Sequence, residues 1–358
     1  MKLISKLFSF LFLLVSLPLG LLLVISGWSG FLYTDSFPLT SLTGLAFPAI
    51  LLINLLIALL YAIIMRKMPW IPLIAILLTI NPILAYSPLS FKSEPKESKG
   101  REFCVLSYNI HGLKPIGAEL AHEAGDMISD YVTNCDADII CLQESDSKRF
   151  ERKMENDTSF LKRLPFSCHT AGMTVIARWP IIEYHPIDFP ESGNSCLYCR
   201  LLVGTDTMAI FNCHFQSIGL KQKEIDDYNR MLVHPKDTSG LEGFRSVIRK
   251  LAAASVRRAS QADMVADLID VETARYILLC GDFNDTPLSY THHVMSERLT
   301  DAYGKSGTGP GISYHLNRLF FRIDHMFCSS NITPLHCRVD NSIEASDHYP
   351  LKARFRMD

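Results

Sequence analysis

The first 90 residues contain only five charged side chains, and this feature constrains the fold of the chain most. The five are Lys2, Lys6, Asp35, Arg66 and Lys67. Three apolar segments occupy residues 8–28, 45–65 and 70–86. The first two are long enough to cross a hydrocarbon layer of about 30 Å as helices. The third is shorter and contains Pro72 and Pro82, but spanning helices tolerate proline.

We therefore predict that residues 1–87 form a membrane anchor with about three transmembrane helices. A cleaved signal peptide is the alternative for the first segment, but that apolar run is longer than a signal sequence requires and a second run follows it. The basic residues lie before the first segment and between the second and third, which places the N-terminus inside. Three spans then put the rest of a multi-pass protein on the extracytoplasmic side, whereas two spans leave it in the cytoplasm.

The remainder of the chain is acidic. The anchor holds four of the 35 basic residues and one of the 37 acidic residues, so the rest carries a formal charge of −5. Proteins that hold long nucleic acid neutralise many phosphates with lysine and arginine, so this balance argues against that class. Five basic residues do cluster between positions 245 and 258. Such a run is either a basic binding face or an ordinary solvated helix face.

A compositional change separates the anchor from a folded domain. Residues 88–101 are rich in Ser, Pro, Lys and Glu, which predicts a flexible linker. From residue 102 onward, apolar strand-like runs alternate with amphipathic stretches, including predicted helices over residues 119–134 and 242–270. Some strand-like runs also follow one another directly. The pattern predicts an α/β domain over residues 102–358, with two packed mixed β-sheets flanked by helices in a four-layer α/β/β/α sandwich.

Polar side chains follow most of these apolar runs, at the points where the strands are expected to end. They are Asn109, His111, Glu144, His214, Asp282, Asn284, Asp324, Asp347 and His348. Strands that end in this way can assemble one polar site along a single edge. Each residue alone also fits an ordinary role, since an aspartate after a glycine is usually a turn residue. Their joint occurrence favours a site.

This set of side chains suits the hydrolysis of phosphate esters. Carboxylates such as that of Glu144 bind a hard divalent cation such as Mg²⁺, with Mn²⁺ as an alternative. The amides of Asn109 and Asn284 can hold phosphate oxygens without adding negative charge. A histidine held by an aspartate can take a proton from water, and His348 with Asp324 is the candidate pair.

The order of the motifs resembles the endonuclease/exonuclease/phosphatase superfamily. The motifs are "GDFN" at 281–284, "RIDHMF" at 322–327 and "SDHYP" at 346–350. The superfamily includes exonuclease III-type nucleases, deoxyribonuclease I and sphingomyelinases, and the resemblance extends over residues 102–358. The arrangement of three spans before this domain is similar to that of membrane-anchored bacterial members.

The resemblance implies which residues bind the metal and the phosphate. Glu144 and Asp347 match carboxylates of the metal site. Asn109 matches the asparagine that follows the first strand, and we expect it to bind phosphate. His214 and Asn284 match catalytic residues that contact the scissile phosphate.

The resemblance also implies the residues that act on water. Asp282 matches the aspartate that orients or activates the attacking water. Asp324 matches the partner of the final histidine, and His348 matches that histidine, as general base or transition-state stabiliser. Where repair nucleases carry an aspartate two residues after the first asparagine, this chain has His111. An imidazole there can face the site because residues i and i+2 share one face of a strand.

These inferences lead to a membrane-anchored, divalent-metal-dependent phosphoesterase. The anchor raises the effective concentration of a membrane-bound substrate, so a phospholipid or a lipid-linked phosphate is the expected substrate. An exported nuclease is the second hypothesis, with the basic cluster at 245–258 as its support. A non-catalytic, phosphate-binding membrane scaffold is the third. The expected partners are the substrate and the lipid bilayer, and the sequence indicates no protein partner.

Overall fold

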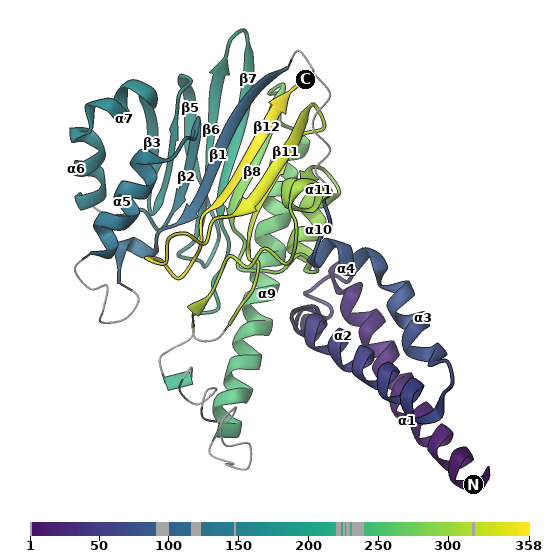
Figure 1. Cartoon of the computed structure of the whole chain (residues 1–358). Coiled ribbons are helices and arrows are strands. Elements are labelled where there is room, and N and C mark those ends of the chain that lie inside the picture. Colours follow the sequence, from purple (N-terminus) through teal and green to yellow (C-terminus); the bar gives the residue numbers. More distant parts are fainter. Residues whose placement is uncertain are drawn as a thin grey trace. The chain divides into compact units, whose positions relative to one another are not determined.

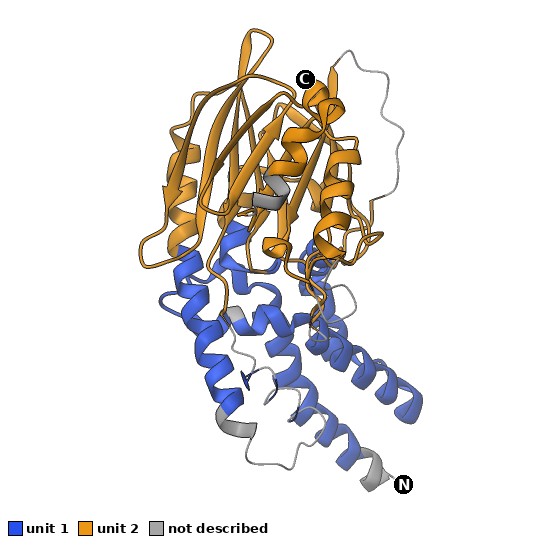
Figure 2. Cartoon of the chain, turned by 90° about the vertical axis from the view of Figure 1, so that its left-hand side faces the viewer, with its two compact units in different colours: residues 1–86, 220–259, 286–293 blue, residues 87–219, 260–285, 294–358 orange. Residues whose placement is uncertain are grey.

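The chain divides into two compact units in a computed structural model, which describes residues 2–90, 100–115, 123–146, 148–219, 223–224, 226, 230, 240–316 and 319–358. Unit 1 consists of residues 1–86, 220–259 and 286–293, and unit 2 of residues 87–219, 260–285 and 294–358 (Figure 2). The unit that contains the N-terminal helices thus also includes two stretches of the predicted catalytic domain. Most of the predicted linker (91–99) and the start of the helix predicted at 119–134 lie outside the described residues.

The N-terminal helices of unit 1 are apolar. They are α1 (Lys2–Gly27), η1 (Ser29–Phe31), α2 (Pro38–Met65), α3 (Trp70–Leu78) and α4 (Ile80–Tyr86), of which α1 and α2 are long. In α1 and α2, the segments Lys6–Gly27 and Pro38–Met65 are long and apolar enough to cross a membrane, and only 17% and 28% of their most apolar stretches are buried. Because a core helix of a soluble domain would be mostly buried, both are candidate membrane spans. The first also lies where a signal sequence would lie.

The third predicted segment is divided into α3 and α4. Pro82 has no N–H group to donate to the carbonyl oxygen of Leu78, and the indole N–H of Trp28 donates to that oxygen instead, at 3.0 Å. The buried amide of Asn54 donates to the carbonyl oxygens of Leu19 and Ile50. These polar groups are therefore satisfied within the apolar unit, as a lipid environment requires.

Unit 2 contains two six-stranded mixed sheets (Figure 1). The first sheet has the order β11-β12-β1-β2-β4-β3. Its strands are β1 (Arg101–Asn109), β2 (Ile139–Gln143), β3 (Phe166–Thr170), β4 (Met173–Ala177), β11 (Ile332–Val339) and β12 (Leu351–Met357). The second sheet has the order β5-β6-β7-β8-β10-β9. Its strands are β5 (Ile181–Asp188), β6 (Ser195–Val203), β7 (Asp206–His214), β8 (Tyr276–Asp282), β9 (Thr300–Asp301) and β10 (Asp324–Cys328).

One central pair of strands in each sheet is parallel, and the other pairs are antiparallel. The parallel pairs are β1 with β2 and β7 with β8. Apolar side chains of both sheets form one buried core, in which Val105 and Ile139 of the first sheet cluster with Leu197 and Leu278 of the second. Because both parallel pairs lie in the middle of their sheets, polar side chains at the ends of these four strands can lie close together.

Helices flank the two sheets. The helices of this part of the chain are α5 (Ala124–Asn134), α6 (Lys148–Asn156), α7 (Thr158–Arg163), α9 (Gly240–Asp270), α10 (Tyr290–Ser296) and α11 (Ala302–Ser306), with the short η2 at His111–Leu113. Residues 240–259 of α9 and 290–293 of α10 belong to unit 1. Ile128 of α5 and Phe160 of α7 pack with Leu106 and Ile140, on the side of the first sheet that faces away from the core. This arrangement confirms the predicted fold class of two packed mixed sheets flanked by helices.

The basic cluster at 245–258 lies on α9, but it does not form one continuous exposed face. Arg245, Arg249 and Arg257 are exposed. The ammonium group of Lys250 forms an ion pair with Glu224, and Arg258 is buried. Three exposed arginines along one helix are fewer basic side chains than a protein needs to neutralise the phosphates of a long nucleic acid.

Candidate active site

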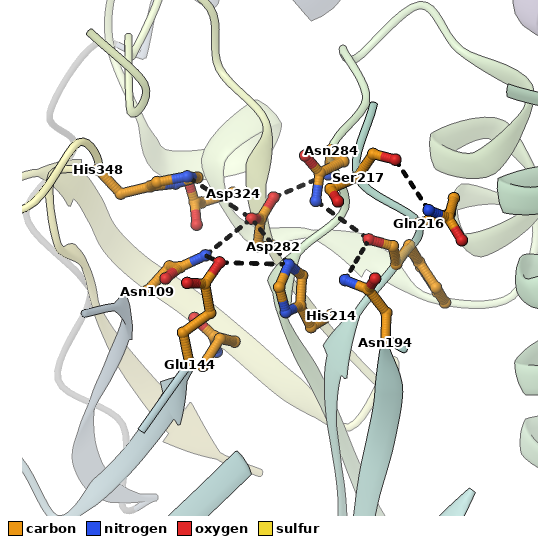
Figure 3. Close-up of polar contacts among 12 residues, drawn as sticks. Asn109, Glu144, Asn194, His214, Gln216, Ser217, Asp282, Asn284, Asp324 and His348 are labelled. Atoms are coloured by element: carbon orange, nitrogen blue, oxygen red, sulfur yellow. Dashed lines mark hydrogen bonds and ion pairs between the residues drawn. The ribbon is translucent and has the colours of Figure 1, made fainter. Parts of the chain in front are cut away.

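Three neighbouring strands of the second sheet place polar residues side by side. His214 ends β7, Asp282 ends β8 and Asp324 begins β10. In the sheet register, Asp282 pairs with His214 on one side and with Asp324 on the other. The carboxylate of Asp282 therefore lies between two titratable side chains, and it is almost fully buried (Figure 3).

Gly281 permits the close approach of β8 and β7 at this point. A side chain at this position would bring its Cβ atom to 1.9 Å from the carbonyl oxygen of Cys213, and the φ angle of +137° is one that only glycine adopts readily. After Asp282 the chain turns away, and the ring of Phe283 packs against Phe215 and Phe327. Asp282 is thus the last residue of β8, and the packing of the Phe283 ring stabilises the end of the strand.

Both oxygens of Asp282 accept hydrogen bonds. Oδ2 accepts from the side-chain amide of Asn109 at 3.0 Å, and Oδ1 accepts from the backbone N–H of Asn284 at 2.8 Å. Burial raises the pKa of the Asp282 carboxyl, and it outweighs the opposing effects of His348 and His214. The carboxylate is thus held in one orientation, and it accepts a proton more readily than an exposed aspartate does.

His348 and Asp324 form a buried hydrogen-bonded pair. The distance from Nδ1 of His348 to Oδ2 of Asp324 is 2.8 Å, and Nε2 of His348 lies 3.6 Å from Oδ2 of Asp282. Burial alone would lower the pKa of the imidazole, but the carboxylates of Asp324 and Asp282 raise that pKa to about 10. The ring of Tyr314 packs edge-on against His348. The imidazole is therefore fixed with Nε2 directed toward Asp282.

The first sheet contributes Asn109 and Glu144 from the ends of its parallel strands. Asn109 ends β1, and Glu144 directly follows β2 in a left-handed conformation with φ of +52°. The amide of Asn109 also reaches Oε1 of Glu144, at 3.3 Å. Asp347 lies in the loop before β12, where the hydroxyl of Ser346 donates to the carbonyl oxygen of Asn109 at 2.7 Å. Asn109 thus connects residues from both sheets.

Two phosphate-contact candidates also lie at this edge. Nε2 of His214 is 3.5 Å from Oδ2 of Asp282 and 3.9 Å from Oε1 of Glu144. This nitrogen is buried and has no hydrogen-bond partner within the described part of the chain. The amide of Asn284 donates to the carbonyl oxygen of Phe215 at 3.0 Å, which leaves its second amide hydrogen for another acceptor. All nine candidate residues, His111 included, therefore lie in unit 2 and are linked by a series of short polar contacts.

One group of described residues has the spacing to hold a metal ion. Asp282, Asp324 and His348 offer ligand atoms that all lie within 4.8 Å of one another. Glu144 and Asp347, the predicted metal ligands, approach the imidazole of His111, which lies 3.7 Å and 3.5 Å from their oxygens. Carboxylates combined with imidazole form a donor set that suits a divalent cation.

The sequence did not identify the buried polar residues beneath the site. Nε2 of Gln143 donates to Oδ1 of Asn212 at 2.7 Å, and both side chains are fully buried. Asn212 in turn donates to the carbonyl oxygen of Leu142, so this pair joins β7 of the second sheet to β2 of the first. The only sequence signal was the glutamine beside Glu144. Tyr314, which contacts His348, lies outside every strand and gave no signal.

Comparison with protein families gives two matches. The model of the Endonuclease/Exonuclease/phosphatase family matches residues 106–348. A second family model, described only as a domain of unknown function, matches residues 6–86. No curated protein matches the chain.

Solved structures with a similar fold are distant in sequence. A humanized D. rerio TDP2 with 14 mutations is 15% identical, with 71% of this chain and 98% of that chain covered and a TM-score of 0.53. D. rerio TDP2 in complex with a single-strand DNA product is 15% identical, with the same coverage and a TM-score of 0.51. Sphingomyelinase C from Streptomyces griseocarneus is 15% identical over 72% of this chain and 100% of that chain, with a TM-score of 0.47. At this identity, the likeness to the two TDP2 structures shows the fold alone.

Proposed function

The chain belongs to the endonuclease/exonuclease/phosphatase family, and from this we propose that it is a membrane-anchored, divalent-metal-dependent phosphoesterase that hydrolyses its substrate with an activated water. The observation that carries the proposal is the position of Asp282, which is buried between His214 and Asp324 at adjacent strand ends. Members of this family are in general hydrolases of phosphate esters. The gathered carboxylate, imidazole and amide groups are those that such a reaction requires.

In the proposed mechanism, Asp282 accepts the proton of the attacking water. Two hydrogen bonds hold its carboxylate, and its raised pKa brings it closer to the range of an efficient base. Asp324 holds Nδ1 of His348, and Nε2, which lies 3.6 Å from Oδ2 of Asp282, is proposed to stabilise the charge that develops on the phosphate. In this mechanism the hydrogen bond between Asp324 and His348 orients the imidazole, and the general base is Asp282.

Three further side chains are proposed to bind the phosphate. The buried Nε2 of His214 has no hydrogen-bond partner in the described chain, and a phosphate oxygen would supply one. The second amide hydrogen of Asn284 is available for another phosphate oxygen. The amide of Asn109 donates hydrogen bonds to Asp282 and Glu144 and so positions both carboxylates. We propose that Asn109 also contacts the phosphate.

Glu144 and Asp347 are the proposed ligands of Mg²⁺ or Mn²⁺. Oε2 of Glu144 and Oδ1 of Asp347 both lie near Nδ1 of His111. Asn109 donates its hydrogen bond to Oε1 of Glu144 and not to Oε2. When bound, the cation neutralises phosphate charge and stabilises the leaving oxygen. The side chain of Glu144 is 36% exposed, whereas that of Asp347 is only 11% exposed.

The proposed substrate is a phospholipid or a lipid-linked phosphate. The apolar helices of unit 1 and the acidic charge of the rest of the chain support it, since an anchored enzyme meets such substrates at high effective concentration. Nuclease activity is the second candidate, and the exposed Arg245, Arg249 and Arg257 are the observation that favours it. A non-catalytic phosphate-binding scaffold is the remaining hypothesis.

We expect the purified full chain to hydrolyse one member of a panel of phospholipids, polyprenyl phosphates and single- and double-stranded nucleic acids in the presence of Mg²⁺ or Mn²⁺. EDTA should abolish the activity, and excess metal should restore it, because the cation stabilises the leaving oxygen. Released phosphate and cleaved diester are measured separately. Cleavage of nucleic acid alone would establish the nuclease alternative, and inactivity over the whole panel would favour the scaffold.

The domain boundaries and the membrane topology are part of the proposal. Residues 1–87 would form the anchor, residues 88–101 the linker and residues 102–358 the catalytic domain. If α3 and α4 together form a third span, the multi-pass chain places the catalytic domain outside the cytoplasm.

Reporter fusions test this topology. Alkaline phosphatase, which is active outside the cytoplasm, and a cytoplasmic fluorescent reporter are each fused after Lys67 and after Arg101. We expect fluorescence after Lys67 and phosphatase activity after Arg101, because only the longer fusion includes the third apolar segment. Fluorescence at both positions would show that residues 70–86 do not cross and that the domain faces the cytoplasm.

A further inference from the structure

The segment that directly follows the catalytic motif belongs to the unit that contains the N-terminal helices. Residues 286–293 lie in unit 1 (Figure 2). The side chain of Leu288 is 5% exposed and clusters with Leu23 of α1 and Phe47 of α2. Asn284, a proposed phosphate ligand, precedes Leu288 by only four residues. The apolar interior of unit 1 therefore includes a residue from the region that the family model matches.

Two glycines let the anchor backbone approach this segment closely. A Cβ atom added at Gly30 would lie 2.8 Å from the carbonyl oxygen of Ser289 and 3.1 Å from that of Leu288. A Cβ atom added at Gly44 would lie 3.3 Å from the carbonyl oxygen of Leu288 and would collide with the hydroxyl of Ser29. That hydroxyl donates to the same carbonyl oxygen at 2.9 Å. Because these acceptors are backbone atoms, they move only if the segment itself moves.

Two aromatic contacts add to this packing beyond the end of α1. The ring of Phe31 lies 4.1 Å from the imidazole of His293, centre to centre. The ring of Tyr33 packs edge-on against that of Tyr290, with the centres 5.2 Å apart. Tyrosine is enriched where spanning helices leave the hydrocarbon layer, and ring pairs in this geometry contribute beyond the area that they bury. Backbone, hydroxyl and ring contacts thus hold residues 286–293 on the anchor.

The chain between this contact and the site is short and is held at both ends. Leu288 follows Asn284 by four residues, which span at most about 14 Å even when fully extended. The carbonyl oxygen of Asp285 accepts a hydrogen bond from Nε2 of His325 at 2.9 Å. The backbone N–H of Asn284 donates to Asp282 at 2.8 Å. A shift of Leu288 therefore moves the turn that orients Asp282, because so few residues join them.

We propose that the anchor positions the active site as well as attaching it to the membrane. Gly30 and Gly44 admit residues 286–293, and these hold the turn at 282–285 in the geometry that hydrolysis requires. The positioning role rests on the proposed function, whereas the contact itself does not. A displacement of about 1 Å at a catalytic group can lower turnover about a hundredfold. Gly30 and Gly44 are therefore positioning residues and not catalytic ones.

The first test introduces Gly30→Ala into the full chain in detergent. We expect the turnover number, corrected for the folded fraction, to fall at least about tenfold, because the added Cβ displaces Ser289. Amide hydrogen exchange of residues 282–293 should rise, whereas exchange in β1 and β2 should not change. A general loss of structure would raise exchange in all of these segments. Normal turnover despite a local rise in exchange would overturn the proposal.

Gly20→Ala on α1 is the matched control. Its added Cβ would lie 3.4 Å from side chains of α3, which is an ordinary contact, so we expect unchanged turnover and exchange. Ser29→Ala covers the case in which Gly30→Ala fails to fold, since it adds no atom and removes the hydroxyl that donates to Leu288. It should raise exchange in residues 282–293 alone, with a smaller loss of turnover. Unchanged exchange in this variant would contradict the contact.

A cleavage experiment tests the contact without reference to activity. A protease site is inserted within residues 91–99, and the anchor fragment is followed after cleavage in detergent through a tag at the C-terminus of the other fragment. We expect the two fragments to remain bound. Residues 88 and 90 also bond to Gly309 and Thr308 within unit 2, so the comparison with Gly30→Ala is decisive. That variant should weaken the association at least about tenfold, because the site has no room for a side chain.

Two outcomes of the cleavage experiment count against the proposal. Fragments that separate in the unaltered chain would show that the anchor is only a tether. Fragments that are retained equally in Gly30→Ala would show that residues 286–293 do not hold them together. Inactivity of the unaltered chain over the whole substrate panel would instead contradict the proposed function, while exchange and cleavage would still decide whether the anchor holds this segment.

Discussion

Asp282→Asn is expected to lower the turnover number at least about a hundredfold on whichever substrate the panel identifies. The substitution keeps the shape of the side chain but removes the group that accepts the proton of water, and losses of this size follow removal of a catalytic base or of preorganised charge. Because burial raises the pKa of this carboxyl, its charged form is unfavourable in the fold. We therefore expect the thermal unfolding midpoint to be unchanged or higher, which separates lost chemistry from lost structure.

Asp285→Asn provides the matched control for this prediction. Asp285 lies three residues further along the chain, and its backbone carbonyl oxygen accepts a hydrogen bond from Nε2 of His325 at 2.9 Å. We expect its turnover number to stay within about threefold of the unaltered protein. Equal losses in the two variants would mean that the motif matters for folding, and near-normal turnover in Asp282→Asn would remove that residue from the mechanism.

Much of the fold was predictable because the central strands are long apolar runs that end in polar residues. The predicted strand-like runs at 103–110, 137–144, 207–215, 276–283 and 322–330 correspond to β1, β2, β7, β8 and β10, and only residues 101–102 of β1 and 206 of β7 lie outside them. β5 was missed because it is an edge strand with mostly exposed side chains and a proline at position 186. β12 was missed although its buried and exposed residues alternate, since Lys352, Arg354 and Arg356 interrupt the apolar run. The strand β3 (Phe166–Thr170) was also missed, and like β5 it is a short or exposed edge strand without a continuous apolar run.

The site residues were predictable by position, but their geometry was not. The left-handed conformations of His111, Glu144 and Asn284 depend on turns that no local pattern signals. The buried pair of Gln143 and Asn212 joins strands of two different sheets, 69 residues apart in the chain. A contact of this kind arises from the packing of the sheets, so it becomes visible only after the fold is known. The order of the motifs therefore predicted the family, which the family model confirms, whereas the contacts around the candidate residues depend on the fold.

His348→Ala is expected to reduce the turnover number at least about a hundredfold, because it removes the imidazole that faces the charge developing on the phosphate. Asp324→Asn should cost less than this, since its effect is transmitted through the orientation of His348 by one hydrogen bond of 2.8 Å. Both effects are measured as steady-state turnover with saturating metal and substrate. His336→Ala, which alters an exposed histidine on β11, is the control and should retain turnover within about threefold.

The double variant determines whether Asp324 acts through His348. If it only orients the imidazole, the loss caused by Asp324→Asn should disappear when His348 is already alanine, so the double variant should match His348→Ala within about threefold. Residues that act as a unit are non-additive in this way. If the two losses instead multiply, Asp324 has a role of its own, and the three ligand atoms that Asp282, Asp324 and His348 offer within 4.8 Å would then be the first place to look for a metal ion.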